Sequence, residues 1–471
     1  MTIPQEDLDH SEANFQPSKR FFVSMLTRDI DLTDAILDLL DNCIDGALRV
    51  IDKDIAMGTP YVGYEANITI NENYFEIVDN CGGIPKKDWR YAFRMGRPDE
   101  NKNNDQGTVG IYGIGMKRAI FKMGESATIT SNSSSGAFNV IITPEWTRNQ
   151  EWKLPLNEND IDEKSTFGTK IKISNLHETI SQKFGESTFV GLIKDQIKHS
   201  LSFIIQKGFT IRLNGDAIQN NPINIIVSEN SIQPYIYKSQ IGRVNIDLVV
   251  GFYRNMSEDD SDDIDYELRR SSEDAGWTII CNDRVVLYCD KTHLTGWGIP
   301  PVPRFHPQFN AISGVVRFSS NYPEDLPITT TKRGVDLGSP LYNEIRNRMM
   351  EGTVFFTKFT NNWKGDHLSE GKKLLTNTRP ISANEFLNKS VEELKKTNTG
   401  NWTNPNKNSN EHRFTPTLPK VKISSNNKRI SFLKNEEDIA TLSEYFFGED
   451  DRPSSEVGEK CFDTILKEIK G

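Results

Sequence analysis

One predicted helix carries an amide and two carboxylates at a spacing that suits a magnesium–nucleotide site. Asp38, Asn42 and Asp45 follow one another at i, i+4 and i+7, which places them on one helix face. The amide oxygen of Asn42 is a suitable ligand for Mg²⁺, a hard ion that binds oxygen and keeps several waters. The Asp38 carboxylate can orient or deprotonate an attacking water. A solvated helix face would carry the same residue types, so further features must decide between the two interpretations.

The second feature is a carboxylate at the end of a hydrophobic strand. Asp79 lies near the end of the segment YFEIVDN (74–80), and Gly82, Gly83 and Ile84 follow it. A carboxylate in this position can accept a hydrogen bond from the exocyclic amine of a base. Glycines beside it let a base approach the backbone closely. An ordinary turn is the alternative interpretation of the same residues.

The third feature is a glycine-rich segment, GTVGIYGIGMK (107–117), ahead of a helix predicted to start near Met116. The backbone amides of such a loop, together with the helix dipole, suit phosphate, and Lys117 adds a positive charge. The segment lacks the Walker A pattern, and it does not follow a strand in a βαβ unit as a Rossmann site does. Its glycines are Gly107, Gly110, Gly113 and Gly115.

The fourth feature is Thr169, which follows Gly168 at the start of the predicted strand TKIKISNL (169–176). Its hydroxyl can bridge the Asp79 carboxylate and a bound base. Alone, a Gly-Thr pair says almost nothing, so its value depends on the other three features.

The hydrophobic pattern predicts the elements that must position these residues. Segment 30–51 reads as a helix, because its apolar residues recur close to a 3.6-residue period. Asp31 and Thr33 are both candidates for its N-terminal cap. Segments 66–70 and 74–80 predict a hairpin, and further strands are expected at 126–130, 137–143 and 169–176. This order indicates an α+β sandwich with helices on one sheet face.

The four features, in this order and at these spacings, resemble the GHKL ATPase superfamily. Its members include the gyrase B subunit, Hsp90 chaperones, MutL mismatch-repair proteins, MORC ATPases and histidine kinases. The resemblance covers about residues 20–180 and implies a Bergerat-type α/β sandwich that binds ATP with Mg²⁺. The matching segments are DLLDNCIDGA (38–47, N box), VDNCGGI (78–84, D-x-G-x-G box), GIYGIGMK (110–117, G-x-x-G-x-G box) and GT (168–169, last box).

The resemblance implies a role for each matched residue. Asn42 would be the Mg²⁺ ligand, Asp38 the catalytic carboxylate and Asp79 the residue that reads adenine. Segment 97–109 would be the ATP lid. The residues expected to contact the nucleotide are Asn42, Asp45, Asp79, Gly83, Ile84, Gly110, Gly113, Gly115, Met116, Lys117 and Thr169.

Two positions depart from the family pattern. The N box commonly carries Glu where this chain has Asp38, and Asp is shorter by one methylene. The attacking water must then lie closer or the helix must shift, so slow hydrolysis, or none, stays an open alternative; Asp41 is a less favoured substitute base. Cys81 replaces the first glycine of the D-x-G-x-G box and narrows the pocket, but Gly82 and Gly83 keep the turn feasible.

A second, transducer-like α/β domain is expected to follow, with a predicted strand at 209–215 among its elements. In gyrase-, MutL- and MORC-like proteins such a domain reaches a lysine on a loop to the γ-phosphate. Lys332 in LPITTTKRGVD (326–336) is the candidate here, with Arg333 as the alternative and a basic surface loop as the other interpretation. Histidine kinases lack this domain. The expected domains are 1–183 (ATP-binding), 184–363 (transducer-like), 364–428 (basic and linker-like) and 429–471 (a small C-terminal α/β element).

Charge and composition bound the function further. The net charge of −10 argues against a protein that coats nucleic acid generally. Residues 364–434 hold 14 Lys/Arg and 6 Asp/Glu, a net charge of +8, whereas 257–275 is acidic; both runs can be simply solvated. Five scattered cysteines without a C-x-x-C pair indicate reduced thiols and a cytoplasmic protein. We expect neither a signal peptide nor a membrane-spanning helix.

These observations predict an ATP-gated conformational switch. Two protomers would close on each other when ATP orders the lid and Lys332 meets the γ-phosphate, and hydrolysis would reopen them. The partner can be DNA or protein, possible settings being bacterial defence or DNA maintenance. The alternative is a nucleotide-responsive, chaperone-like binding module with little or no hydrolysis.

Overall fold

The computed structural model describes residues 18–51, 58–94, 113–149, 151–161, 166–220, 222–228, 232–255, 274–329, 332–364, 367–376, 378–397, 401–404, 410–421 and 430–470. The chain forms two compact units, residues 1–420 and 421–471. The larger unit contains two sheets, which we describe as the first and second domains. None of the helices within the described ranges is both long enough and apolar enough to cross a membrane.

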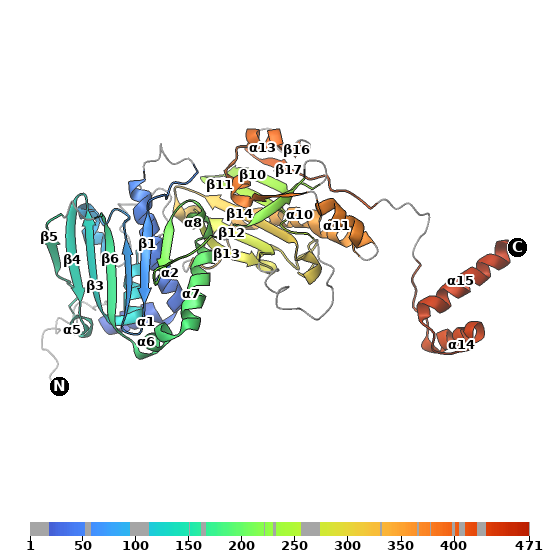
Figure 1. Ribbon diagram of the computed structural model, residues 1–471, viewed down its shortest axis with the longest axis horizontal. Helices are drawn as coiled ribbons and strands as arrows, with labels where there is room; N and C mark the ends of the chain where they lie inside the picture. Colours follow the sequence, from blue (N-terminus) through green and yellow to red (C-terminus); the bar gives the residue numbers. More distant parts are fainter. Residues whose placement is uncertain are drawn as a thin grey trace, which may run out of the picture. The chain divides into compact units, whose positions relative to one another are not determined.

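Within the described residues, the first domain is built on an eight-stranded sheet in the order β5-β4-β3-β6-β2-β1-β7-β8 (Figure 1). β1 and β2 form the predicted hairpin, with Ile68 opposite Ile77, whereas β1 and β7 pair in parallel. The strands are β1 Glu65–Ile70, β2 Tyr74–Asp79, β3 Gly124–Ser133, β4 Gly136–Ile142, β5 Leu156–Asn159, β6 Gly168–Leu176, β7 Thr210–Leu213 and β8 Asp216–Ala217.

Helices cover one face of this sheet. Side chains alternate between buried and half-buried along β1 and β2, so one face of each strand faces the core. The core-facing side chains pack with those of α2 and α4, and α1 packs against α4. The helices are α1 Lys19–Arg28, α2 Leu32–Val50, α3 Trp89–Ala92, α4 Gly115–Met123, α5 Pro144–Arg148, α6 Glu178–Gly185, α7 Ser187–Ser200 and α8 Ser202–Gln206, with a 3-10 turn, η1, at Lys86–Asp88. The predicted α+β class is confirmed.

The first sheet continues past residue 183. β7 corresponds to the strand predicted at 209–215, but it pairs with β1 rather than with a strand of the second domain. Phe209, Ile211 and Leu213 are buried in the first core, which explains why this strand returns there. The hydrophobic pattern predicts a strand at 209–215, but it does not say which of the two sheets that strand joins.

The second domain, as far as the structure describes it, is built on a seven-stranded sheet in the order β13-β12-β14-β11-β10-β17-β16. Every residue of β12 is buried, and helices pack on its sheet: α10 contacts β10, β11 and β14, α7 and α8 contact β13, and α12 contacts β11. The strands are β10 Tyr235–Ile241, β11 Val244–Phe252, β12 Gly276–Cys281, β13 Arg284–Asp290, β14 Ile312–Ser319, β16 Trp402–Thr403 and β17 His412–Phe414. The long helix is α10 Pro340–Asn362, and short 3-10 turns lie at η3 His293–Thr295, η4 Pro307–Phe309 and η5 Pro323–Asp325.

The segment expected to be a linker, 364–428, differs from that expectation. Its elements include α11 Leu368–Thr376, β15 Arg379–Ser382, α12 Ala383–Asn388 and α13 Val391–Thr397. β15 pairs with β9 (Asn224–Val227), and β17 adds to the edge of the second sheet beside β10. The segment has few apolar residues, but Ala383, Phe386 and Leu387 are all buried in the second core. Composition therefore does not predict the helices and strands of this segment, because only a few buried side chains anchor them to the second core.

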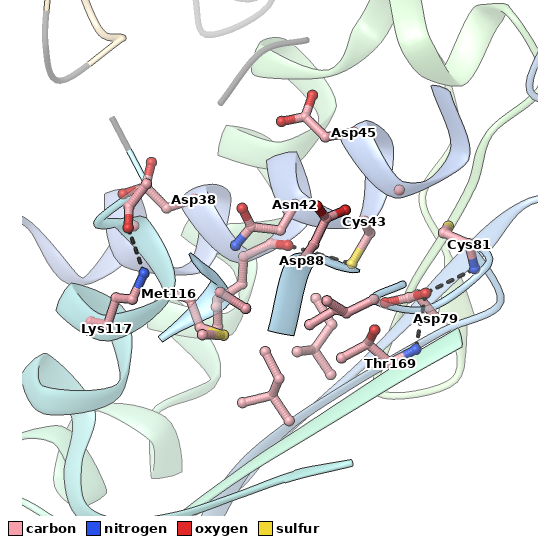
Figure 2. A pocket seen from close by; sticks show the side chains of 18 of the residues that line it. Asp38, Asn42, Cys43, Asp45, Asp79, Cys81, Asp88, Met116, Lys117 and Thr169 are labelled. Carbon is pink, nitrogen blue, oxygen red and sulfur yellow. Dashed lines mark hydrogen bonds between the residues drawn. The ribbon is translucent and has the colours of Figure 1, made fainter. Parts of the chain in front are cut away.

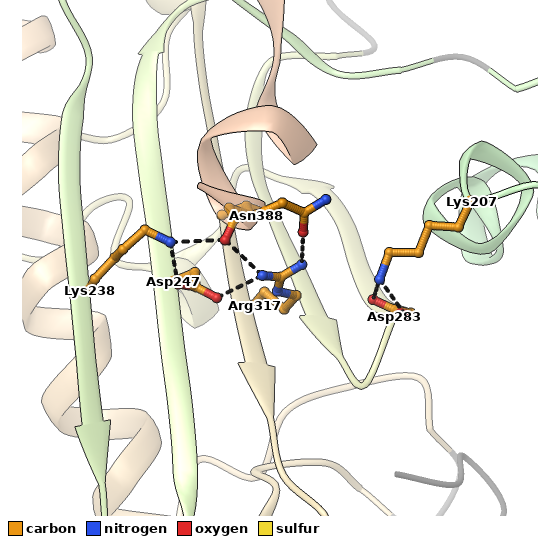
Figure 3. A network of polar contacts seen from close by, with 7 residues as sticks. Lys207, Lys238, Asp247, Asp283, Arg317 and Asn388 are labelled. Carbon is orange, nitrogen blue, oxygen red and sulfur yellow. Dashed lines mark hydrogen bonds and ion pairs between the residues drawn. The ribbon is translucent and has the colours of Figure 1, made fainter. Parts of the chain in front are cut away.

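A charged cluster fastens the end of α12 to the second sheet (Figure 3). The Leu387 carbonyl accepts from Lys238 Nζ at 2.9 Å and from Arg317 Nη2 at 2.8 Å. Arg317 Nη1 also donates to Asn388 Oδ1 at 2.7 Å, and Asp247 forms ion pairs with both cations. Lys238 and Arg317 thus satisfy one of the carbonyls that the end of a helix leaves without intrahelical partners.

The C-terminal unit contains α14 Glu436–Phe447 and α15 Ser454–Lys470; its described residues form helices alone, where an α/β element was predicted. Ser443 and Val457 are buried, whereas several large apolar side chains are exposed, among them Tyr445 and Ile469. So little burial means that the described part of this unit has almost no core of its own.

Candidate functional site

A cavity of about 270 Å³ opens beside α2, between the turn after β2 and the start of α4 (Figure 2). Residues from each of the four sequence features line this cavity, together with Lys332 from the second domain. Gly110 and the expected lid, 97–109, lie outside the described residues. The predicted residues that line it are Asp38, Asn42, Asp45, Asp79, Gly83, Ile84, Gly113, Gly115, Met116, Lys117, Thr169 and Lys332.

Helix α2 forms one wall of this cavity because its apolar side chains are buried on the opposite side. Asp31 is the N-cap residue, with extended backbone, and Thr33 lies in the first turn. Asn42 is exposed, although its neighbours Asp41 and Cys43 are buried. The core thus fixes the helix, and the helix presents the Asn42 amide to the cavity.

Around Asp79 the cavity wall comes from the first sheet; we call this part the Asp79 end. Asp79 Oδ1 accepts hydrogen bonds from the backbone N–H of Cys81 at 2.8 Å and of Thr169 at 3.2 Å (Figure 2). Burial raises the pKa of Asp79, and these two backbone bonds only partly offset that effect. The carboxylate is therefore held in a fixed direction by the protein itself.

Two glycines at the Asp79 end are required by close backbone approaches. Gly83 has φ +68°, and a Cβ there would lie 2.2 Å from the Asn132 carbonyl oxygen. A Cβ on Gly168 would lie 1.9 Å from the Asp79 carbonyl oxygen. No side chain fits at such distances. Cys81, in place of the family's first glycine, needs no left-handed backbone, because Gly82 and Gly83 carry the positive φ values.

Ser131 on β3 also holds the turn after β2, and none of the four sequence features includes this residue. Its hydroxyl accepts from the Ile84 backbone N–H at 2.8 Å and lies 3.3 Å from Thr169 Oγ1. The side chain is 1% exposed. Ser131 thereby links the turn after β2 to the start of β6. The signal available in the sequence is alternation, since Ser131 follows Ala127 and Ile129 at every second position and so shares their face of the strand.

Around Asp38 the wall comes from α2, from α4 and from the second domain; we call this part the Asp38 end. α4 begins at Gly115, where a Cβ would lie 3.1 Å from Asp38 Oδ2. Lys117 Nζ donates to the Gly113 carbonyl at 2.5 Å, and Gly113 has φ +66°. The amides of the first helical turn suit an anion, as does the adjacent lysine.

Lys332 reaches the Asp38 end from the second domain. Its Nζ donates to Asp41 Oδ2 at 2.8 Å and lies 3.7 Å from Asp38 Oδ1. Burial lowers the pKa of Lys332, but the carboxylates of Asp41 and Asp38 outweigh burial, so the pKa is raised overall and the side chain is a cation. Arg333, the alternative, forms an ion pair with Asp34 and donates to Thr33 Oγ1, away from the cavity lining.

Arg118 is a cavity residue that the sequence features missed, although it directly follows Lys117. Its Nη2 donates to Asp38 Oδ2 at 2.7 Å, and both side chains are largely buried. The Asp38 carboxylate is therefore held by Arg118 while Lys332 lies near its other oxygen. An anion entering this end would meet three cations close together.

The donor set at the Asp38 end fits Mg²⁺. Asn42 offers an amide oxygen to the cavity and Asp38 a carboxylate, and both are hard oxygen donors. Such an ion usually takes one or two protein ligands and completes its shell with phosphates and water. The arrangement can therefore hold a nucleotide with its base near Asp79 and its phosphates between Asn42, Lys117 and Lys332.

Comparison with known families agrees with this geometry. No curated protein matches the chain. Residues 30–180 match the family model described as "Histidine kinase-, DNA gyrase B-, and HSP90-like ATPase". The match includes α2, the turn after β2, the start of α4 and the start of β6, which together line the cavity. Residues 30–180 of this chain are thus a domain of the GHKL ATPase superfamily.

Proposed function

We propose that this protein is an ATP-gated conformational switch in which the second domain senses the terminal phosphate. The observation that carries the proposal is the position of Lys332, buried at the Asp38 end although it belongs to the second domain. ADP lacks the phosphate that this cation would meet. The two nucleotides therefore bind one arrangement of the domains with different affinity, which is the requirement for a nucleotide to shift a conformational equilibrium.

The hydrolysis step is assigned to α2. Asp38 orients a water and takes its proton as the oxygen attacks the γ-phosphorus; the bond to the β–γ bridging oxygen breaks, leaving ADP and phosphate. Asn42 would hold Mg²⁺, which neutralises charge on the phosphates when bound. Lys117 and the first turn of α4 bind and orient the phosphates.

Closure of two protomers on ATP is the expected output. Mass photometry of the full chain with a non-hydrolysable ATP analogue, with ADP and without nucleotide tests it. We expect a dimer with the analogue and smaller species with ADP. Equal mass and equal hydrodynamic size under all three conditions would contradict an ATP-dependent dimer, while leaving ATP binding intact.

A nucleotide-responsive binding module with little or no hydrolysis is the second candidate, and the Arg118–Asp38 bond favours it. Arg118 already occupies one Asp38 oxygen at 2.7 Å, and Asp38 is a short side chain for a catalytic base. A phosphate-release assay with Mg²⁺ and ATP separates the two candidates. Phosphate release above the buffer rate supports the ATPase; saturable ATP binding without release supports the module.

The partner of the switch is proposed from the basic character of residues 364–434 and from the family's DNA- and protein-directed members. Either DNA or a protein partner fits a cytoplasmic protein of bacterial defence or DNA maintenance. Electrophoretic mobility shift with and without ATP, over a salt series, tests the DNA branch, because phosphate contacts make affinity steeply salt-dependent. Failure to shift DNA at low salt would favour a protein partner.

A further inference from the structure

A second cation from the second domain meets the same carboxylate as Lys332. Arg284 begins β13 and is 3% exposed, and its Nε lies 3.6 Å from Asp41 Oδ1. Lys332 Nζ lies 2.8 Å from the other oxygen, Asp41 Oδ2. Asp41 is fully buried on α2, directly before Asn42. One carboxylate of the N box therefore holds two separate segments of the second domain.

The contact between Arg284 and Asp41 is only partly formed. Among the described residues, Asp41 Oδ1 and the Nε and Nη1 atoms of Arg284 have no hydrogen-bond partner. A buried guanidinium and a buried carboxylate face each other 3.6 Å apart, beyond the usual length of about 2.7–2.9 Å for a charge-assisted bond. A small approach of either group would close it. Buried polar groups are rarely left in this condition, so the geometry requires an explanation.

The tip of the β12–β13 hairpin is held independently of the loop that carries Lys332. Asp283 accepts two bonds from Lys207 Nζ, both at 2.7 Å (Figure 3). Asn282 is bonded to Ser320 through both its amide nitrogen and its amide oxygen, each at 2.9 Å. Arg284 can thus stay beside Asp41 when Lys332 moves.

We propose that Arg284 is a positioning residue: it forms the ion pair with Asp41 when Lys332 moves from this carboxylate to the terminal phosphate. The inference rests on the proposed ATP-dependent switch. If Lys332 left without a replacement, Asp41 would be a buried, unpaired charge, which strongly opposes the move. Because Arg284 pairs with Asp41, the carboxylate keeps a counter-charge. Lys332 can then exchange between this carboxylate and the phosphate while the second domain stays attached to α2.

The exchange predicts a change in nucleotide preference rather than a general loss of binding. Without Arg284, Lys332 would be the main cation on Asp41 and would be harder to transfer. Isothermal titration of the full chain with Mg²⁺ gives the affinity ratio between a non-hydrolysable ATP analogue and ADP. For Arg284→Gln and Arg284→Met we expect this ratio to fall about tenfold, a change of about 1.4 kcal/mol. Arg284→Lys, which keeps the charge, is expected to retain most of the ratio.

Two controls separate this role from a structural one. Lys238→Met removes a cation that pairs with Asp247 and the Leu387 carbonyl at the end of α12 rather than with Asp41. It should lower the melting temperature while leaving the ratio within about twofold, since distant sites usually act additively. In a Lys332→Met background, Arg284→Gln should change the ratio no further, because the cation to be transferred is gone.

Two results would overturn the inference. One is a wild-type ratio in both Arg284→Gln and Arg284→Met; the other is an equal fall of the ratio with and without Lys332. A wild-type chain that binds no nucleotide would instead refute the proposed function, so the two failures are distinguishable. If Arg284→Met does not fold, Arg284→Gln alone carries the same test.

Discussion

At the Asp79 end of the cavity the residues that would meet a ligand come from the first domain alone, whereas at the Asp38 end they come from two domains. Asp79 is held by backbone N–H groups, and the turn beside it is set by glycines and by Ser131. Asp38 and Asp41 are held by side-chain cations, including Lys332 from the second domain. The first end is thus preformed, and the second depends on how the domains meet.

This difference suggests a division of labour. ATP and ADP share the base, so the Asp79 end should contribute affinity that is equal for both. They differ in the terminal phosphate, so the Asp38 end should contribute discrimination and turnover. Substitutions at the Asp79 end should therefore change the affinity for both nucleotides alike, and those at the Asp38 end should change discrimination and turnover. Five measurements test that separation.

The largest effect is expected for turnover at the Asp38 end. Asp38→Asn keeps the size of the side chain but removes the base, so phosphate release should fall by about 100-fold or more. Affinity for ADP should change by no more than about threefold, since Asn keeps an oxygen donor. Asp34→Asn, on the same helix but paired with Arg333, is the matched control. Turnover that survives Asp38→Asn would remove Asp38 from the role of base.

The next largest effect is expected at the Asp79 end. Asp79→Ala removes the proposed acceptor for the exocyclic amine and should weaken ATP and ADP by the same factor, about 10- to 100-fold, because hydrogen bonds to charged groups are strong. Glu76→Ala, on the same strand but paired with Lys170 at the surface, serves as the control for β2. Fluorescence titration with both nucleotides measures the effect. A loss confined to ATP would contradict the comparison.

A smaller and selective effect is expected for Lys332. Lys332→Met should weaken the non-hydrolysable ATP analogue about tenfold and leave ADP almost unchanged, because the lost charge-assisted bond is to the terminal phosphate. Arg333→Met, which loses its contacts with Asp34 and Thr33, is the neighbouring control. Parallel calorimetric titrations give both affinities. An equal loss for both nucleotides would mean that Lys332 acts on the whole cavity.

The same contrast explains how far the sequence could predict the molecule. Helix α2, the β1–β2 hairpin and the glycine turn after β2 follow from local spacing, since period and turn chemistry act over a few residues. Asp79 accepts from the backbone N–H groups of Cys81 and Thr169, whereas the Thr169 hydroxyl, predicted to reach Asp79, lies 3.3 Å from Ser131 Oγ. The Asp79 end was therefore largely predictable, although Ser131 was missed.

The Asp38 end was less predictable because its charges come together over long stretches of chain. Only the family resemblance points to Lys332, and Arg284 carries no local signal that sets it apart from a surface arginine. Asp41, interpreted as a less favoured base, is instead buried between two cations. Segment 364–428 was expected to be a linker, because composition does not show that Phe386 and Leu387 fill the second core.

The smallest effect is a pH dependence that belongs to the Asp79 end alone. The pKa of Asp79 is raised above 3.8 by burial, so its protonation on acidification begins at a higher pH than for an exposed aspartate. The ionised form is the better acceptor for an amine, so ADP affinity should fall a few-fold, about threefold, as pH drops through the raised pKa. The Asp79→Asn variant has no carboxyl group to protonate at this position. Subtracting its profile of ADP affinity against pH therefore removes the contribution from titration of the ADP phosphates.

Stability should respond with the opposite sign. A carboxylate whose folded pKa exceeds its unfolded value binds protons more tightly in the native state, so its contribution to stability increases as pH falls through the folded pKa towards 3.8. The wild-type chain should therefore gain stability relative to Asp79→Asn over that interval, while it loses ADP affinity relative to the same variant. Denaturant unfolding at several pH values, without nucleotide, gives the first quantity. Parallel trends in stability and affinity would indicate that another group governs both and that Asp79 does not read the base through its ionised form.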